Sequence, residues 1–240
     1  MLMGAPTVQE ARTISKVLKT FLEASGMEIN LTKSKLFFFN TSIPMQRNLN
    51  RILNIQKNSL PTKYLGIPLS EHAYRSSNWE ALLNKMRARL SSWTHRALNM
   101  ASRLILIKSI LQTMPAYMFS ALAAPKVAYK TIRNIQRSFL WNGPSKKSKW
   151  ALLKWIDICK PKMEGGLGLR DPEILNKAIA AKIWWRWVEN PDSLWGALWK
   201  AKYTTQIRDK DLIRLTGTTQ GYPIWNKAWE NRYIVQQHSF

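Results

Sequence analysis

Acidic residues and cysteine are scarce in this sequence. Only 14 of its 240 residues are Asp or Glu, against 37 Lys or Arg, so the formal net charge is +23. The single cysteine, Cys159, excludes an intramolecular disulfide framework and a thiolate-rich zinc site within the chain. The first five residues contain no basic region leading into a long apolar run, so they predict no signal peptide. We therefore expect an intracellular protein, cytoplasmic or nuclear, and not a secreted one.

The few carboxylates are also unevenly placed along the chain. None lies between Glu80 and Asp157, and residues 76–150 carry 13 basic residues against one acid. Cations at this density repel one another unless a partner compensates them, which indicates a polyanion, with nucleic acid ahead of anionic lipid. The alternative is a basic surface that is merely solvated.

The shortage of carboxylates argues against metal-dependent chemistry. Two-metal catalysis needs several carboxylates that converge on one site. Asp209 and Asp211 are the only close pair, and the basic residues around them favour a surface loop with local ion pairs. The three histidines, His72, His95 and His238, have no cysteine or carboxylate at ligand spacing. We predict no metal site and no bound cofactor in this chain.

Tryptophan is absent from the first 78 residues, since all 12 tryptophans lie between Trp79 and Trp229. This change of composition predicts a boundary near residue 75. We expect a mainly α protein, with a small α+β unit over residues 1–75, a basic helical region over residues 76–150 and a second helical region over residues 151–240. The tryptophans at helical core spacing are expected to pack inside: Trp79, Trp93, Trp184 and Trp185.

Capping residues and apolar spacing predict the elements of the first unit. Thr7 and Glu10 form a capping box for a helix that runs to about Ser25 and ends at Gly26. Residues 35–39 read as a short strand and residues 46–53 as a second helix. Residues 63–69 read as two short strands that turn near Gly66.

The same reasoning predicts that the rest of the chain is helical. Asp171, followed by a proline and an acid, is expected to cap one of these helices. A bend is expected at Pro115 in another. The predicted helices cover residues 79–93, 102–122, 126–140, 171–189, 193–203 and 224–234.

Three features could suggest a membrane span, a phosphate-binding loop or a reactive cysteine, but the residues around them favour structural interpretations. Residues 104–125 are apolar enough to suggest a membrane span, but Lys108 lies among them, so we expect a buried helix and no membrane partner. Residues 165–168 are rich in glycine but lack the spacing of a phosphate-binding loop, which favours a tight turn. Lys160 and Lys162 could lower the pKa of the Cys159 thiol, yet a buried structural cysteine is the preferred interpretation.

A sharper pattern lies on the helix predicted over residues 126–140. At 100° per residue its four cations fall in a sector about 60° wide, and four apolar residues lie broadly on the other side. The cations are Lys126, Lys130, Arg133 and Arg137, and the apolar residues are Val127, Ile132, Ile135 and Phe139. On the preceding helix, Lys85, Arg89 and Arg96 align in a similar way. A basic ridge of this kind is suited to contacts with backbone phosphates, and an idle solvated face is the alternative.

Seven short stretches, taken in order, resemble a known family over nearly the whole chain. They are SGMEINLTKSK (25–35), KYLGIPL (63–69), RLILIKSIL (103–111), FLWNG (139–143), ICKPK (158–162), GGLGLRD (165–171) and KAKY (200–203). This series resembles the C-terminal part of the reverse transcriptase of LINE-type non-LTR retrotransposons, an RNA-directed DNA polymerase, especially in its plant branch.

The resemblance implies the end of a palm domain followed by thumb and connection regions. A lysine in palm motif D of that family assists nucleotide handling, and motif E is a hairpin that grips the primer end. The matching positions are Gly26, Asn30 and Lys33 for motif D, and Tyr64, Leu65 and Gly66 for motif E.

In that family the paired catalytic aspartates precede the stretch that residues 1–6 resemble. The resemblance therefore implies a truncated fragment that keeps primer-template binding elements, contacts RNA or DNA through phosphates and is inactive as an enzyme on its own. Magnesium serves the full-length family, and a palm and fingers segment in trans is one conceivable partner. The alternative function is a basic helical module that binds anionic partners generally, nucleic acid or lipid surface, with no enzymatic role.

Overall fold

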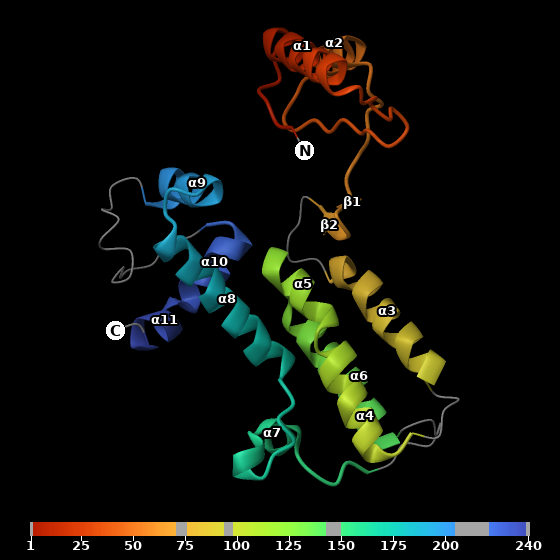
Figure 1. Ribbon diagram of the computed structural model, residues 1–240, viewed down its shortest axis with the longest axis vertical. Helices are drawn as coiled ribbons and strands as arrows, with labels where there is room; N and C mark the ends of the chain where they lie inside the picture. Colours follow the sequence, from red (N-terminus) through yellow and green to blue (C-terminus); the bar gives the residue numbers. More distant parts are fainter. Residues whose placement is uncertain (1, 71–75, 94–97, 143–149, 205–220, 239–240) are drawn as a thin grey trace. The chain divides into compact units, whose positions relative to one another are not determined.

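The computed structural model describes the chain except for residues 1, 71–75, 94–97, 143–149, 205–220 and 239–240 (Figure 1). The described residues are mainly helical, with a small two-stranded sheet, which confirms the predicted fold class. The chain divides into two compact units, Met1–Glu71 and His72–Phe240, which are described separately below.

The first unit is built around two helices that pack against each other, α1 (Val8–Ser25) and α2 (Ile43–Leu53) (Figure 1). The Thr7 hydroxyl accepts a hydrogen bond from the Glu10 amide at 3.2 Å, so α1 begins at the predicted cap. Gly26 ends α1 with a left-handed backbone, φ 67°, a conformation that favours glycine. Both predicted ends of this helix are confirmed.

A tight hairpin follows, formed by β1 (Thr62–Tyr64) and β2 (Ile67–Leu69). The strands are antiparallel, with Tyr64 opposite Ile67, so only Leu65 and Gly66 form the loop. Both loop residues have positive φ, 49° and 81°, as a turn that matches the twist of a hairpin requires. The predicted hairpin is confirmed.

The prediction of a strand over residues 35–39 is wrong. In this region the backbone of Leu36 forms only an isolated parallel bridge with Lys57. An apolar run becomes a strand only where another strand can pair along it, and the described residues offer this run no such partner. Phe39 consequently remains 65% exposed.

The second unit contains the long apolar segment as three helical pieces. They are α4 (Met100–Leu106), a π-helical turn, η1 (Ile107–Leu111), and α5 (Met114–Ala121). The irregularity therefore lies before the predicted bend, because Pro115 occupies the first turn of α5, where a missing amide hydrogen is harmless. Met100–Ala121 is long and apolar enough to cross a membrane, but core helices of soluble proteins pass the same test, so this is weak evidence. Within the unit Ile107 and Phe119 are fully buried.

Two further helices pack with this segment. The first is α3 (Ser77–Trp93), which contacts both α5 and α6 (Lys126–Asn142). Trp79 of α3 and Ile132 of α6 are fully buried, and the Trp79 ring lies 5.3 Å from that of Phe119. The apolar spacing of these helices thus predicted their packing faces correctly.

The remaining helices gather around α8 (Pro172–Glu189), which contacts α5, α6, α10 and α11 (Figure 1). They are α7 (Trp155–Cys159), the 3-10 turn η2 (Lys162–Glu164), α9 (Leu194–Tyr203), α10 (Pro223–Glu230) and α11 (Arg232–His238). The predicted N-cap at Asp171 is confirmed, since its carboxylate accepts from the Glu173 amide at 2.9 Å. The helix predicted over residues 224–234 is two helices, with Asn231 at the break.

Aromatic rings hold the far end of α8 against α9 and α10. Trp184 and Trp187 are fully buried with their rings edge to face at 4.9 Å, and Tyr203 stacks on Trp225 at 4.3 Å. The predicted burial of Trp79, Trp93 and Trp184 is confirmed. Trp185 is 37% exposed. Successive side chains of a helix point about 100° apart, so Trp185 turns away from the buried face that Trp184 occupies.

One lysine is buried beside this cluster. Lys227 of α10 is 6% exposed, and its ammonium donates a hydrogen bond to the Phe119 carbonyl in the last turn of α5. The negative end of the α5 dipole favours a cation there. Burial nevertheless lowers the pKa of Lys227 to about 8.

The two units differ sharply in how much apolar surface they bury. Ala11 and Leu49 are the only fully buried apolar residues among those described in the first unit. In the second unit more than twenty apolar residues are buried, several of them tryptophan. The stability of a small unit depends on buried apolar area, so the first unit has little to hold it together.

We expect the first unit to unfold locally before the second. Limited proteolysis should cut first within residues 40–77 and leave a fragment that contains all twelve tryptophans, which mass spectrometry of the fragments would identify. Cleavage at equal rates in both units would contradict this prediction.

Candidate nucleic-acid interface

The helix α6 presents the predicted ridge of cations. Lys126, Lys130 and Arg137 are exposed, while Ile132 and Phe139 on the other side are buried in the second unit. These three cations are called the α6 row below. Their 3.6-residue periodicity follows from helix geometry, and the buried side fixes which way they point.

The members of the α6 row have no acidic partner in the part of the chain that the structure describes. None of the three forms an ion pair among the described residues. Their ammonium and guanidinium groups are therefore available to an external anion. Val127, predicted on the apolar side, is 63% exposed, because it lies in the first turn of α6, at the margin of the packing face.

Arg133, the fourth cation of the predicted ridge, is engaged inside the protein. Its Nε donates to Asp171 Oδ2 at 2.7 Å and its Nη2 donates to Asp171 Oδ1 at 3.0 Å. The side chain is 34% exposed, against 10% for Asp171. The prediction of Arg133 as a free phosphate contact is corrected on this geometry, since a two-pronged pair of this kind is directional and strong.

The Asp171 carboxylate collects two further donors. Trp155 Nε1 of α7 donates to Oδ2 at 2.9 Å, and the Glu173 amide caps α8 through Oδ1. Burial acts to raise the pKa of Asp171, but the hydrogen bonds from Arg133, the Glu173 amide and Trp155 outweigh it, and the pKa is lowered. The hydrogen bond to Asp171 raises the pKa of Arg133 in turn.

The cations predicted on the preceding helix fall partly within the structure. Lys85 and Arg89 are exposed on α3, which packs against α6, and neither forms an ion pair among the described residues. Arg96 lies outside the described residues. Lys85 and Arg89 are thus two further exposed cations on the helix that packs against α6.

The motif D positions lie in one turn of the first unit. Asn30 Oδ1 accepts from the Lys33 amide at 3.0 Å, so this side chain shapes the turn that carries Lys33. Gly26 stands just before this turn as the cap of α1, and the Lys33 side chain is exposed.

The motif E positions form the β1–β2 hairpin. Tyr64 is the last residue of β1, and Leu65 with Gly66 makes the two-residue loop. Tyr64 and Leu65 are 40% and 73% exposed, so this hairpin presents apolar surface at its tip.

Cys159 is a free, half-buried cysteine, and the glycine-rich stretch forms a turn. Burial raises the pKa of the Cys159 thiol to about 11, contrary to the lowering that nearby lysines could have produced. Lys160 is instead paired with Asp157 at 2.9 Å. The amides of Gly166 and Gly168 donate to carbonyls of the same segment at 3.1 and 2.9 Å, so the predicted tight turn is confirmed and these donors are not free for phosphate.

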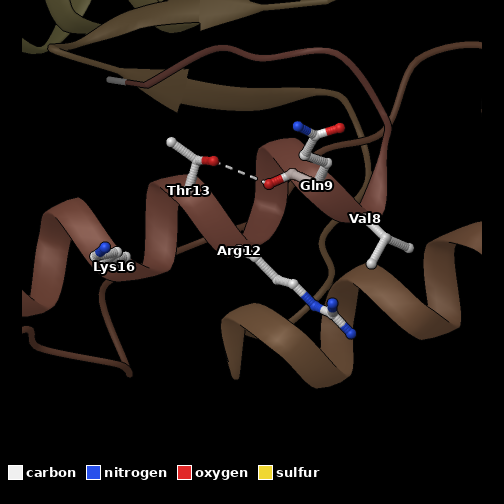
Figure 2. A pocket seen from close by; sticks show the side chains of 5 residues that line it. All are labelled: Val8, Gln9, Arg12, Thr13 and Lys16. Atoms are coloured by element: carbon white, nitrogen blue, oxygen red, sulfur yellow. Dashed lines mark hydrogen bonds between the residues drawn. The ribbon is translucent and has the colours of Figure 1, made fainter.

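Metal ligands do not gather in the part of the chain that the structure describes, where no group of three His, Cys, Asp or Glu residues could hold an ion. Asp209, Asp211, His72 and His95 lie outside the described residues. A hollow on α1 is lined by Val8, Gln9, Arg12, Thr13 and Lys16 (Figure 2). Its side chains come from one helix face, and the Thr13 hydroxyl donates to the Gln9 carbonyl at 3.1 Å, which leaves no catalytic grouping there.

Comparison with known proteins identifies relatives in Arabidopsis thaliana. "Putative ribonuclease H protein At1g65750" is 30% identical over 166 residues, which cover 69% of this chain and 26% of that protein. "Uncharacterized mitochondrial protein AtMg00310" is 31% identical over 145 residues, which cover 52% of this chain and 94% of that protein. The chain belongs to the family of this mitochondrial protein. No protein-family model matches it.

These relatives support a retroelement-derived protein. The chain spans only 26% of the length of the first relative, so the comparison concerns one part of that protein. The name of the first relative refers to ribonuclease H, whereas the mitochondrial relative carries no stated activity.

The Asp171 contacts lead to a prediction about stability. Replacing Asp171 by Asn should lower the free energy of unfolding at pH 7 by about 2–3 kcal/mol, less than for a fully buried pair because Arg133 is partly exposed. The pKa of Asp171 is lower in the folded chain, so this contribution is present above the unfolded value of about 3.9 and is lost as the pH falls through the folded value.

Urea unfolding of the wild type and the Asp171→Asn variant, followed by tryptophan fluorescence, would measure this difference. The gap between the two proteins should be full at pH 7 and should shrink as the pH falls below about 4. Asp157→Asn is the matched control, because its pair with Lys160 is exposed and should matter little. A gap that stays constant down to low pH would contradict the assignment.

Proposed function

We propose that this protein is the C-terminal, thumb-and-connection part of a LINE-type non-LTR reverse transcriptase lineage and that it binds RNA or DNA through backbone phosphates. The observation that carries the proposal is the α6 row, three exposed cations that form no ion pair with any described residue, on a helix whose other side is packed. The relatives support the retroelement origin, and the order of the motif-like stretches supports this segment of the enzyme.

Electrostatics explains why a row of cations would bind nucleic acid without reading its sequence. Each phosphate that a cation neutralises releases condensed counterions, so affinity falls with salt by about 0.9 logarithmic units per contact on duplex DNA. Contacts to phosphate position the protein but do not distinguish bases. Lys85 and Arg89, exposed on the adjoining helix, are two further cations for such contacts.

The first unit corresponds in this proposal to the end of a palm domain. Lys33, in the turn shaped by Asn30, would assist nucleotide handling in a complete enzyme. The hairpin tip at Tyr64, Leu65 and Gly66 would contact a primer end. Neither role can be exercised without the metal-binding aspartates, and the first aspartate of this chain is Asp157.

The binding proposal predicts the effect of removing the α6 row. The triple variant Lys126→Gln, Lys130→Gln and Arg137→Gln should bind duplex DNA more weakly and flatten the log-log salt dependence by up to about 3 units. Circular dichroism and melting temperature should stay nearly unchanged, because the packed side of α6 is untouched. Fluorescence anisotropy titrations at several salt concentrations would measure the slope.

A control variant separates location from net charge. Arg12, Lys16 and Lys182 are also exposed, and replacing them by Gln changes the charge by the same amount. This control should alter the salt slope far less than the α6 variant. Equal slopes for both variants and the wild type would show that the α6 row is idle solvated surface.

The proposal also predicts that these 240 residues do not polymerise DNA. With an RNA template, a DNA primer and magnesium or manganese, no extension should appear on a denaturing gel, because the sequence contains no adjacent pair of aspartates like the one that holds the metal ions in the family it resembles. Metal-dependent extension by the purified chain would contradict this. Alanine at Asp209 and Asp211 would then test whether that pair binds the metal.

A further inference from the structure

A group of apolar side chains stands out into solvent before and around α7. Trp150 is 92% exposed, Leu152 80%, Ile156 71% and Met163 99%. Each of the other tryptophans is at most 37% exposed, so Trp150 is an exception within its own residue type. These four residues are called the α7 apolar patch below. Four strongly exposed apolar side chains within residues 150–163 differ from the scattered single ones that need no explanation, and such groups mark binding surfaces.

The patch is anchored to the same framework as the α6 row. Trp155, five residues after Trp150, is buried and donates to Asp171, the carboxylate that also receives both Arg133 donors of α6. Ile156 follows this anchor directly on α7. Trp150 thus reaches solvent from a segment that is tied to α6.

Exposed cations lie close to the patch residues in the sequence. Lys154, Lys162 and Arg170 are exposed, and none of them forms an ion pair among the described residues. An occupant of this surface must therefore be anionic and must also offer apolar area. A second copy of the chain, with its own charge of +23, does not meet the first condition.

We propose that the α7 apolar patch binds unpaired bases of a single-stranded segment that adjoins a duplex held by the α6 row. Single-stranded nucleic acid combines phosphates with flat apolar bases, which stack on exposed aromatic side chains. Isoleucine and methionine side chains also make apolar contacts with bases, as they do where they insert between the base steps of a duplex. This inference rests on the proposed function and adds a second kind of contact to it, one that depends on bases and not on phosphates.

The test compares three labelled DNA ligands by fluorescence anisotropy: a blunt duplex, the same duplex with a short single-stranded overhang, and that duplex with an abasic overhang. The abasic overhang keeps the phosphates and lacks the bases. The wild type should bind the normal overhang at least about fivefold more tightly than the abasic one. Equal affinity for these two ligands would overturn the inference.

Variants assign the difference to the patch. Trp150→Ala should remove the preference for the normal overhang but leave blunt-duplex affinity and its salt slope unchanged, and Trp150→Phe should restore most of the preference. Met163→Ala should reduce it in part. Tyr222→Ala removes another exposed aromatic ring and serves as the control. Because Trp150 is almost fully exposed, its replacement should not change the melting temperature.

Other outcomes identify another occupant. If Trp150→Ala leaves the overhang preference intact but abolishes sedimentation with phosphatidylserine vesicles, the patch binds lipid and the inference is wrong. Failure of the proposed function looks different, since the α6 triple variant would then bind the blunt duplex as tightly as the wild type does. An overhang preference that survives in both Trp150→Ala and Met163→Ala would also overturn the inference.

Discussion

The second unit depends on one buried carboxylate. Asp171 receives two donors from Arg133 of α6, one from Trp155 of α7 and one from the first turn of α8. A carboxylate so nearly buried is tolerated only when its oxygens are hydrogen-bonded and its charge is paired. Because the four donors come from three segments, this requirement fixes α7 and the start of α8 against the middle of α6.

The same requirement divides the positive charges of α6 into two groups. Arg133 pairs with Asp171, whereas Lys126, Lys130 and Arg137 are exposed and form no ion pair with the residues that the structure describes. The same carboxylate holds Trp155, while Trp150, five residues earlier, is 92% exposed. The Arg133–Asp171 pair thus distinguishes Arg133, which stabilises the fold, from the three cations that we propose to bind nucleic acid.

The two units have different physical characters. Rings around Trp184, Trp187 and Trp225 give the second unit a dense core, and the buried ammonium of Lys227 is accepted there because it meets the carbonyl end of α5. The first unit buries only Ala11 and Leu49 completely among its described residues. Its hairpin and the turn around Asn30 are held by contacts between residues close together in the chain.

Local chemistry in the sequence determined the ends of α1 and α8, the Leu65-Gly66 turn and the periodic burial of α6, because caps, positive φ and helical phase depend only on residues close together in the chain. Local sequence wrongly predicted a strand over residues 35–39, since a strand needs a pairing partner that local sequence does not specify. The π turn before Pro115 and the break at Asn231 depended in the same way on packing. Only the tertiary structure decided that Arg133 is bound to Asp171, 38 residues away. Long-range pairing is set by how helices pack. Helical phase alone therefore predicted the same exposed position for all four cations of the ridge.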